Sequence, residues 1–301
     1  MKQLLRVLAW TVGAIVVVVA VAGCALYLTT QRRIEKKWNV AGHAVTVPTD
    51  SLALARGQHI ATAISKCAEC HTPDFGGGQF IDAPPVARLW AANLTRGKGG
   101  IGGQLSDLEW ERAIRHAVKP DGSPLLFMPA IEFQHLSDED VAALIAYLKS
   151  VPPVDREPKA NSVGPIGRAL FLKGDLPLLS AEIIDHNAAH TPRLAMAATA
   201  EYGRYIADIG GCKGCHGEGL SGGKIPGAPP EWLPAANLTP TGIGQYTEAD
   251  FFRAMREGKR PSGAAINPPM PIRWTKQMTD DEIRALWLYL KTVPPKEYGR
   301  R

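Results

Sequence analysis

The segment Cys67-Ala68-Glu69-Cys70-His71 recurs as Cys212-Lys213-Gly214-Cys215-His216, so the chain contains the pattern C-x-x-C-H twice. Two cysteines three positions apart lie on one face of a helix, one turn from each other. These motifs use four of the five cysteines, and the fifth, Cys24, lies in an apolar stretch. No disulfide framework is left to propose, and we expect a bound group to set the fold around each motif.

C-x-x-C-H is the attachment site of c-type haem, in which two thiols add covalently to the porphyrin and the adjacent histidine ligates the iron. Zinc knuckles, disulfides and thioredoxin-like redox pairs also use C-x-x-C, but the immediate histidine in both copies favours haem. The sequence therefore predicts two covalently bound haem c groups. The expected haem-binding residues are Cys67, Cys70, Cys212 and Cys215, with His71 and His216 as axial iron ligands.

The surroundings of the two motifs are also repeated, at separations of 141 to 145 residues. Asn93-Leu94-Thr95 returns as Asn237-Leu238-Thr239, and each copy ends in a helix followed by two prolines. Helix-capping pairs recur in matching places, namely Ser106 with Glu109, Ser137 with Asp140, Thr247 with Asp250, and Thr279 with Glu282. This pattern indicates an internal duplication of about 100 residues.

The duplication predicts an all-α protein with two tandem domains after an N-terminal helix. We expect a membrane anchor or lipoprotein signal at 1–31, a stem at 32–50, domains at 51–154 and 200–297, and a connector at 155–199. In the first domain we expect one helix to run directly into Cys67, followed by Gly- and Pro-rich turns without regular structure. The connector should contain a short helix at 167–173 and, because of its apolar content, pack on the domains.

The N-terminal region contains no charged side chain from Val7 to Gln31, a run of 25 residues. A helix of that length measures roughly 37 Å, which is enough to cross a bilayer. A cleaved signal peptide has an apolar stretch of only about 7–15 residues, which favours a retained anchor. The alternative is a lipoprotein box at Val21-Ala22-Gly23-Cys24, in which the chain is cleaved and lipid is attached to Cys24.

The formal net charge of +5 belongs to this N-terminal region, because residues 1–37 hold six basic side chains and one acidic one. The remaining chain is near neutral, which argues against a nucleic-acid partner. The basic residues after the apolar run would place the folded part in the cytoplasm by the positive-inside rule. The resemblance of the two motifs to those of c-type haem proteins, which receive haem on the outer side of the bacterial cytoplasmic membrane, instead implies a periplasmic location. We expect that location, because long domains cross the membrane largely regardless of flanking charge.

The sixth ligand of each iron decides between electron transfer and small-molecule binding. Met128-Pro129 in the first copy matches Met270-Pro271 in the second, each in a proline-rich loop before the last capped helix. We therefore expect Met128 and Met270 to be the second axial ligands. A loop-packing role is the alternative for both. Met255 and Met278 align with apolar residues of the first copy, and we expect them in the core.

With the order of motif, Asn-Leu-Thr loop, Met-Pro loop and Pro-Pro stop in view, the chain resembles class I cytochrome c domains in tandem. More narrowly, residues 51–155 and 200–297 resemble the membrane-anchored cytochrome c subunits of bacterial alcohol, aldehyde and gluconate dehydrogenases. The resemblance implies thioether attachment at the four motif cysteines and the axial pairs His71 with Met128 and His216 with Met270. Those subunits are usually described with three haem domains, whereas this chain has two.

The expected function is non-catalytic. A membrane-anchored, periplasm-facing dihaem cytochrome c would carry electrons between a dehydrogenase or quinol-oxidising complex and an oxidase or soluble cytochrome. The alternative is a dihaem cytochrome c peroxidase, which would need one haem open to peroxide and so two unlike distal positions. The presence of Met-Pro in both halves argues against that enzyme. A haem-based sensor has no attached signalling domain to support it.

Overall fold

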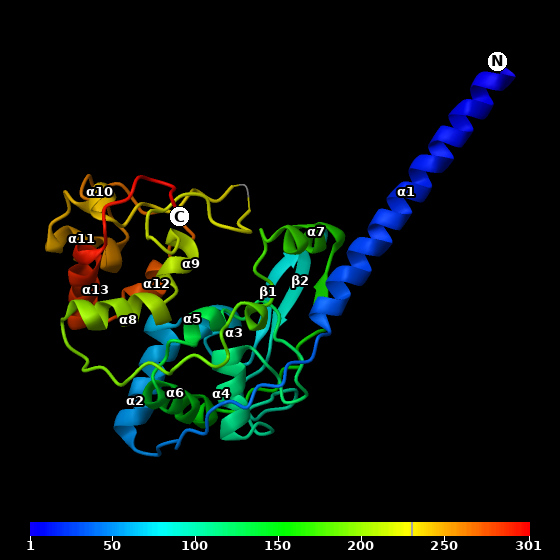
Figure 1. Ribbon diagram of the computed structural model, residues 1–301. Helices are drawn as coiled ribbons and strands as arrows, with labels where there is room; N and C mark the ends of the chain where they lie inside the picture. Colours follow the sequence, from blue (N-terminus) through cyan, green and yellow to red (C-terminus); the bar gives the residue numbers. More distant parts are fainter. Residues whose placement is uncertain (230) are drawn as a thin grey trace.

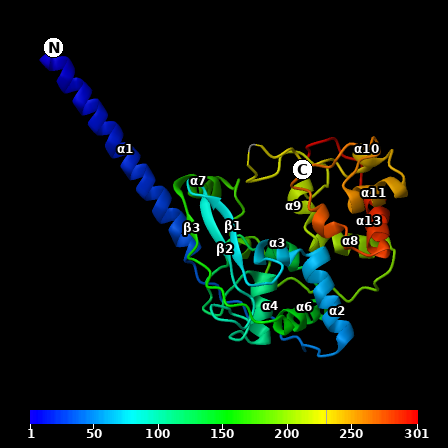
Figure 2. The same ribbon diagram turned by 180° about the vertical axis from the view of Figure 1, so that it is seen from behind.

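The computed structural model describes residues 1–229 and 231–301 and is mostly helical. The first helix, α1 (Lys2–Ile34), projects from the rest of the molecule, with the N-terminus at its far end (Figures 1 and 2). Its most apolar 18-residue window has a mean hydropathy of 2.5 and none of that window is buried. By length and composition α1 could cross a membrane, and a signal sequence near an N-terminus has the same properties.

After α1 the two sequence repeats fold into two mainly helical units (Figure 1). The units share five helices in the same order, but the first also has a π-helical turn and two strands, and the second has one additional short helix. The first repeat contains α2 (Ser51–His59), the π-helix η1 (Ile60–Ile64), α3 (Cys67–His71), β1 (Gly78–Ala83), β2 (Ala87–Ala91), α4 (Asp107–His116), α5 (Ala130–Phe133) and α6 (Asp138–Ser150). The connector contains β3 (Ser162–Val163), α7 (Pro165–Lys173) and η2 (Ser180–Glu182). The second repeat contains α8 (Ala200–Ile209), α9 (Cys212–His216), α10 (Pro240–Ile243), α11 (Glu248–Glu257), α12 (Ile272–Thr275) and α13 (Asp280–Thr292).

In each repeat the first and last helices cross at a glycine. The Cβ of any other residue at Gly57 in α2 would collide with the carbonyl oxygen of Ala143 in α6. The same collision would occur at Gly203 in α8 against Ala285 in α13. Both crossings depend on the missing side chain, since only glycine lets the two backbones approach this closely.

The helix that leads to the first motif differs from the expected one. It changes from α to π geometry at Ile60, where the Ser65 N–H donates to the Ile60 carbonyl five residues back over 2.8 Å. It then ends at Lys66, which adopts a left-handed conformation with φ of 53°. The prediction of one helix running into Cys67 was therefore wrong, because a left-handed residue separates the two helices.

A small antiparallel sheet replaces the irregular loop expected after the first motif. Strand β1 pairs with β2 from Gly78↔Ala91 to Ala83↔Ala87, with a bulge near Gln79, and β2 also pairs with β3 of the connector. Apolar residues of this hairpin pack against Phe171 and Leu178 of the connector. The expected all-α fold is thus correct for most of the chain but not for this segment. The connector provides an apolar surface on which the segment forms a hairpin.

The connector packs against the protein, as its apolar content predicts, and it holds the end of α1. The Arg168 guanidinium in α7 donates to Thr30 Oγ1 and to Gln31 Oε1, each over 2.7 Å. Arg33 pairs with Glu182 over 2.5 Å, and its guanidinium lies 3.9 Å from the ring centre of Phe171. The direction in which α1 leaves the folded part is therefore set by specific contacts.

The two repeats share one hydrophobic core. Ile60 and Ile64 of η1 are fully buried in the same cluster as Tyr202 and Ile206 of α8. Apolar burial of this kind is the main stabilising term in folding, so the repeats form a continuous body. A single core also fixes the position of one C-x-x-C-H motif relative to the other.

Candidate haem-binding sites

Helices α3 and α9 present the two motifs in the same way. Each is a five-residue helix that begins at the first motif cysteine, directly after a residue in the left-handed conformation, Lys66 or Gly211. All four motif cysteines are free thiols in the described structure. Their spacing on one turn leaves both sulfurs of each pair available for thioether bonds to one porphyrin.

Each motif histidine is held by one ring nitrogen. His71 Nδ1 lies 2.8 Å from the Ala92 carbonyl oxygen, and His216 Nδ1 lies 2.7 Å from that of Ala236. The carbonyl is an acceptor, so Nδ1 carries the proton and Nε2 has a free lone pair. A second hydrogen bond of this kind is what orients a metal-ligating histidine and fixes its tautomer. The pattern fits an iron ligand at both positions.

Burial sets the protonation of these groups. It lowers the pKa of His71 and of His216, so both imidazoles are neutral and able to donate a lone pair to iron. It raises the pKa of the Cys67 thiol to about 12 and that of the Cys212 thiol to about 11. A thioredoxin-like redox pair has a depressed thiol pKa, so these protonated thiols do not match that alternative.

In each repeat the Asn-Leu-Thr loop is hydrogen-bonded to the segment that follows the last helix. Asn93 Nδ2 donates to the Val154 carbonyl over 2.7 Å, and Asn237 Nδ2 donates to the Lys296 carbonyl over 2.8 Å. Both acceptors lie just after a Pro-Pro stop. The Asn-Leu-Thr loop and the Pro-Pro stop, which are separate patterns in the sequence, are therefore in contact. Because the residue before each asparagine accepts the bond from the motif histidine, this contact ties the histidine's partner to the end of the last helix.

The two Met-Pro loops have the same backbone geometry. Pro129 has φ and ψ of −81° and 50°, Pro271 has −84° and 57°, and each proline begins a four-residue helix, α5 or α12. Met128 and Met270 are partly buried and pack against the shared core, as do Cys67 and Cys212. Met255 and Met278 are buried in that core, as the alignment of the repeats predicted.

The buried indole of Trp110 bears on whether the structure could hold a bound group. Its side chain is only 2% exposed, and its Nε1–H has no hydrogen-bond partner among the described residues. A buried indole N–H normally finds an acceptor, because an unpaired buried donor is costly. The indole N–H would suit a bound group that carries an acceptor, and Trp110 belongs to the core against which Cys67 and Met128 pack.

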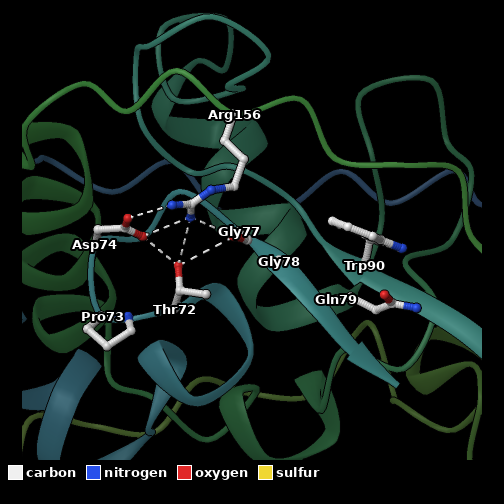
Figure 3. Close-up of a pocket in the computed structure, with 8 residues that line it drawn as sticks. All are labelled: Thr72, Pro73, Asp74, Gly77, Gly78, Gln79, Trp90 and Arg156. Carbon is white, nitrogen blue, oxygen red and sulfur yellow. Dashed lines mark hydrogen bonds and ion pairs between the residues drawn. The ribbon is translucent and has the colours of Figure 1, made fainter. Parts of the chain in front are cut away.

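The loop after His71 is held by charge. Arg156 donates to Asp74 Oδ2 over 2.9 Å and to the Gly77 carbonyl over 2.8 Å, beside a shallow open pocket that Trp90 also lines (Figure 3). Hydrogen bonds from Arg156 and from Thr72 hold the pKa of Asp74 well below its usual range. The Arg156 bonds therefore fix the loop that follows the motif.

Sequence reasoning missed the residues that lie between the two motifs. Ser65 Oγ donates to the Ile209 carbonyl over 3.1 Å, and Lys66 Nζ donates to the Gly210 carbonyl. The Glu132 carboxylate of α5 lies where a side chain on Gly214 would be, and burial raises its pKa to about 7. The sequence signal for Glu132 was a difference between the repeats, because the second repeat has Trp274 at the matching position.

The cytochrome c family profile matches residues 54–152 and 200–294, which is most of both repeats. Among characterised proteins, the chain is 34% identical to the cytochrome c subunit of a quinone-dependent alcohol dehydrogenase from Gluconobacter oxydans, over 86% of this chain and 58% of that subunit. It is 28% identical to a gluconate 2-dehydrogenase cytochrome c subunit from Pantoea cypripedii, over 80% of this chain and 60% of the relative.

These dehydrogenase subunits are longer proteins, and the chain spans somewhat more than half of their length. A "Diheme cytochrome c-type" protein from Cereibacter sphaeroides matches more evenly, with 28% identity over 81% of this chain and 86% of that protein. The dehydrogenase relatives are named as cytochrome subunits and not as the subunits that perform the dehydrogenation. Both repeats match the family profile, and the chain belongs to the cytochrome c family.

Proposed function

We propose that the chain is a dihaem c-type cytochrome, anchored in the bacterial inner membrane by α1, with its folded part in the periplasm. It carries electrons between a dehydrogenase or quinol-oxidising complex and an oxidase or soluble carrier. The domains are residues 51–154 and 200–297, each with one haem. The axial pairs are His71 with Met128 and His216 with Met270.

The contact between the two motif segments carries this proposal. Lys66 directly precedes Cys67, and its ammonium donates to Gly210, two residues before Cys212. Two redox groups attached to these segments would belong to one rigid body with a shared core. That arrangement suits transfer of electrons through the chain, because neither group has to diffuse to reach the other.

Haem iron supplies the one-electron couple when it is bound. The protein's own part is to hold that group and to keep its ligands unchanged. His71 and His216 are oriented by their Nδ1 bonds, and Cys67 and Cys212 pack against the apolar core. Thioether sulfur from Met128 and Met270 is a soft ligand that favours ferrous iron and so raises the reduction potential.

The contacts at the base of α1 support membrane anchoring with this orientation. Arg33 pairs with Glu182, and Lys37 pairs with Asp121 over 2.6 Å. Arg33 and Lys37, two of the four basic residues after the apolar run, thus have acidic partners in the folded part, which reduces the weight of their charge in the positive-inside rule. Tyr27 lies near the end of the apolar run, with the Arg168 guanidinium 4.3 Å from its ring centre, and an aromatic residue there suits a membrane interface.

A haem count tests the cytochrome assignment. The detergent-solubilised full chain should contain two covalent haems, measured by the pyridine haemochrome spectrum against protein mass. Both should be low-spin when ferric, and the ferrous protein should bind carbon monoxide poorly. Rapid turnover of hydrogen peroxide would favour the peroxidase instead, and a single haem would overturn the dihaem assignment.

The membrane assignment has its own test. A reporter that is active only in the periplasm, fused after Arg301, should be active, and the protein should stay in the membrane after an alkaline wash. The mass of the purified chain decides between a retained α1 and the lipoprotein alternative. A retained α1 leaves residues 1–23 on the protein, whereas the alternative removes them and adds lipid to Cys24.

A further inference from the structure

A cluster of metal-ligating side chains lies outside both haem-binding sites. His43 comes from the stem, Asp138 is the first residue of α6, and His190 comes from the connector. One ligand atom from each of the three lies within 4.8 Å of the other two. Three segments that are far apart in the sequence therefore converge on a space the size of one ion.

The distances suit a small divalent cation. His43 Nε2 lies 3.4 Å from Asp138 Oδ2, and His190 Nδ1 lies 2.8 Å from Asp138 Oδ1. Two ligand atoms that are each about 2.0–2.1 Å from a tetrahedral zinc ion lie roughly 3.3 Å apart. His190 Nδ1 now shares a proton with Asp138 Oδ1, and zinc would displace that proton to the solvent. Small movements of the two imidazoles would then place three ligands around one ion.

A buried framework holds these ligands in place. The fully buried Glu111 accepts the backbone N–H of His43 over 3.0 Å. Arg115, 1% exposed, donates to Asp138 Oδ1 and to the Leu136 carbonyl, each over 2.7 Å. The guanidinium binds the carboxylate by Oδ1 and leaves Oδ2 for a cation, and its Nη1 lies 3.4 Å from His190 Nδ1. Two carboxylates against one guanidinium give the cluster a net negative charge, which attracts a cation.

A second imidazole pair nearby does not form such a site. His116 Nδ1 and His186 Nδ1 lie 3.0 Å apart, and His186 Nε2 lies 3.0 Å from the Ala181 carbonyl. That carbonyl oxygen accepts a hydrogen bond from His186 Nε2–H, so His186 Nδ1 is unprotonated and accepts a hydrogen bond from His116 Nδ1–H. The two rings are therefore hydrogen-bonded to each other. The His43 and His190 side chains are 52% and 29% exposed and remain open to an ion from solution.

We propose that His43, Asp138 and His190 form a zinc(II) site with a fourth position open to water. Two imidazoles and a carboxylate are a ligand set that zinc accepts. Bound zinc would fasten the stem and the connector to the first repeat. The stem continues from α1 and the connector contacts the end of α1 through Arg168 and Glu182, so the site would stiffen the junction between the anchor and the folded part.

The test uses the untagged full-length protein with both haems attached, at pH 7.5, and zinc sulfate as the probe. Competition with a chromogenic zinc chelator should show one site per chain. His43→Ala and His190→Ala should each weaken binding at least about 100-fold, since loss of an outer-shell partner alone costs about 10–100-fold. His135→Ala, which removes an exposed imidazole outside the cluster, should leave the affinity unchanged.

Two further measurements keep the result decisive. An unchanged haem spectrum in each variant shows that the protein has folded. Zinc X-ray absorption should show nitrogen and oxygen ligands at about 2.0–2.2 Å, and sulfur ligands would mean zinc bound to cysteines instead. The proposal is overturned if zinc binds equally well to wild type and His43→Ala, or if His186→Ala is the variant that loses it.

Discussion

Tyr205 in α8 donates its hydroxyl proton to Asp140 in α6 over 2.7 Å and so joins the second repeat to the first. The reverse contact uses the equivalent helices, because His59 at the end of α2 lies 2.7 Å from Glu282 in α13. Arg56, largely buried, lies between the two carboxylates, 2.6 Å from Asp140 and 3.5 Å from Glu282. The repeats are thus held together by a polar cluster with approximate two-fold symmetry.

Loss of the Tyr205 hydroxyl should loosen this junction. Tyr205→Phe removes the bond to Asp140 and leaves the Ser137 N–H without its acceptor. We expect a loss of about 1–3 kcal/mol in the free energy of unfolding, the usual cost of a buried unpaired group. Urea unfolding followed by far-UV circular dichroism measures it. Tyr298→Phe, at an exposed tyrosine, is the control, and an equal effect in both would contradict the prediction.

The glycine crossings should tolerate no side chain. Gly57→Ala and Gly203→Ala each force a Cβ against a backbone carbonyl, and we expect each to cost about 2–3 kcal/mol or more. Thermal unfolding of the haem-loaded protein is the measurement. Gly103→Ala serves as the control, because a Cβ there would meet only ordinary contacts with Arg96. Similar melting temperatures for Gly57→Ala and Gly103→Ala would rule out the close crossing.

Replacement of the proposed distal ligands should change one haem at a time. Met128→Ala and Met270→Ala are each expected to convert one haem to a high-spin form that binds carbon monoxide. Replacement by histidine should keep that haem low-spin and lower its reduction potential, because the soft thioether is lost. Absorption spectra and potentiometric titration report both effects. Met255→Leu and Met278→Leu, at core methionines, should leave both spectra unaltered.

Glu132 should make stability depend on pH between about 4 and 7. Burial raises its pKa to about 7, whereas a carboxyl in the unfolded chain titrates near 4.3. The unfolded chain therefore loses this proton first, and the contribution to stability falls as pH rises from about 4 to 7 and then levels off. Denaturant unfolding across this range should show a flatter profile for Glu132→Gln. Glu139→Gln, on the exposed face of α6, should keep the wild-type profile.

Arg168 should control the direction of α1. Arg168→Ala removes the bonds to Thr30 and Gln31, and we expect a wider angular range for α1. Spin labels on α1 and on the first repeat, in the protein reconstituted in lipid nanodiscs, would report this as a broader distance distribution. Arg204→Ala, at a mostly exposed side chain, is the matched control. An unchanged distribution for Arg168→Ala would mean that other contacts set the direction.

The local features of this fold could be predicted because they depend on neighbouring residues. Capping boxes at Ser106, Thr247 and Thr279 are present as expected, and Ser137 accepts from the Asp140 N–H. Short-range hydrogen bonds at helix ends are encoded within four residues. The internal repeat added the match of the two Met-Pro loops, whose shared backbone geometry followed from their shared sequence.

Features that depend on distant segments could not be predicted. The β1–β2 hairpin forms where Leu89 packs against the connector, about 80 residues further along the chain. The cluster of His43, Asp138 and His190 draws on three segments, and no local pattern relates them. The position of Glu132 beside α9 likewise follows from how the repeats pack together.

The π-helical turn at Ile60–Ile64 has a consequence for how such proteins diverge. Cys67 lies ten positions after Gly57 in the sequence, whereas Cys212 lies nine positions after Gly203. A single π-turn accommodates one extra residue inside a helix without changing the helix on either side. The two copies could therefore come to differ in length while the glycine crossing and the cysteine pair both kept their places. A one-residue deletion within Ile60–Ile64 should accordingly restore an α-helix and leave the first motif intact, whereas a deletion after Lys66 would destroy it.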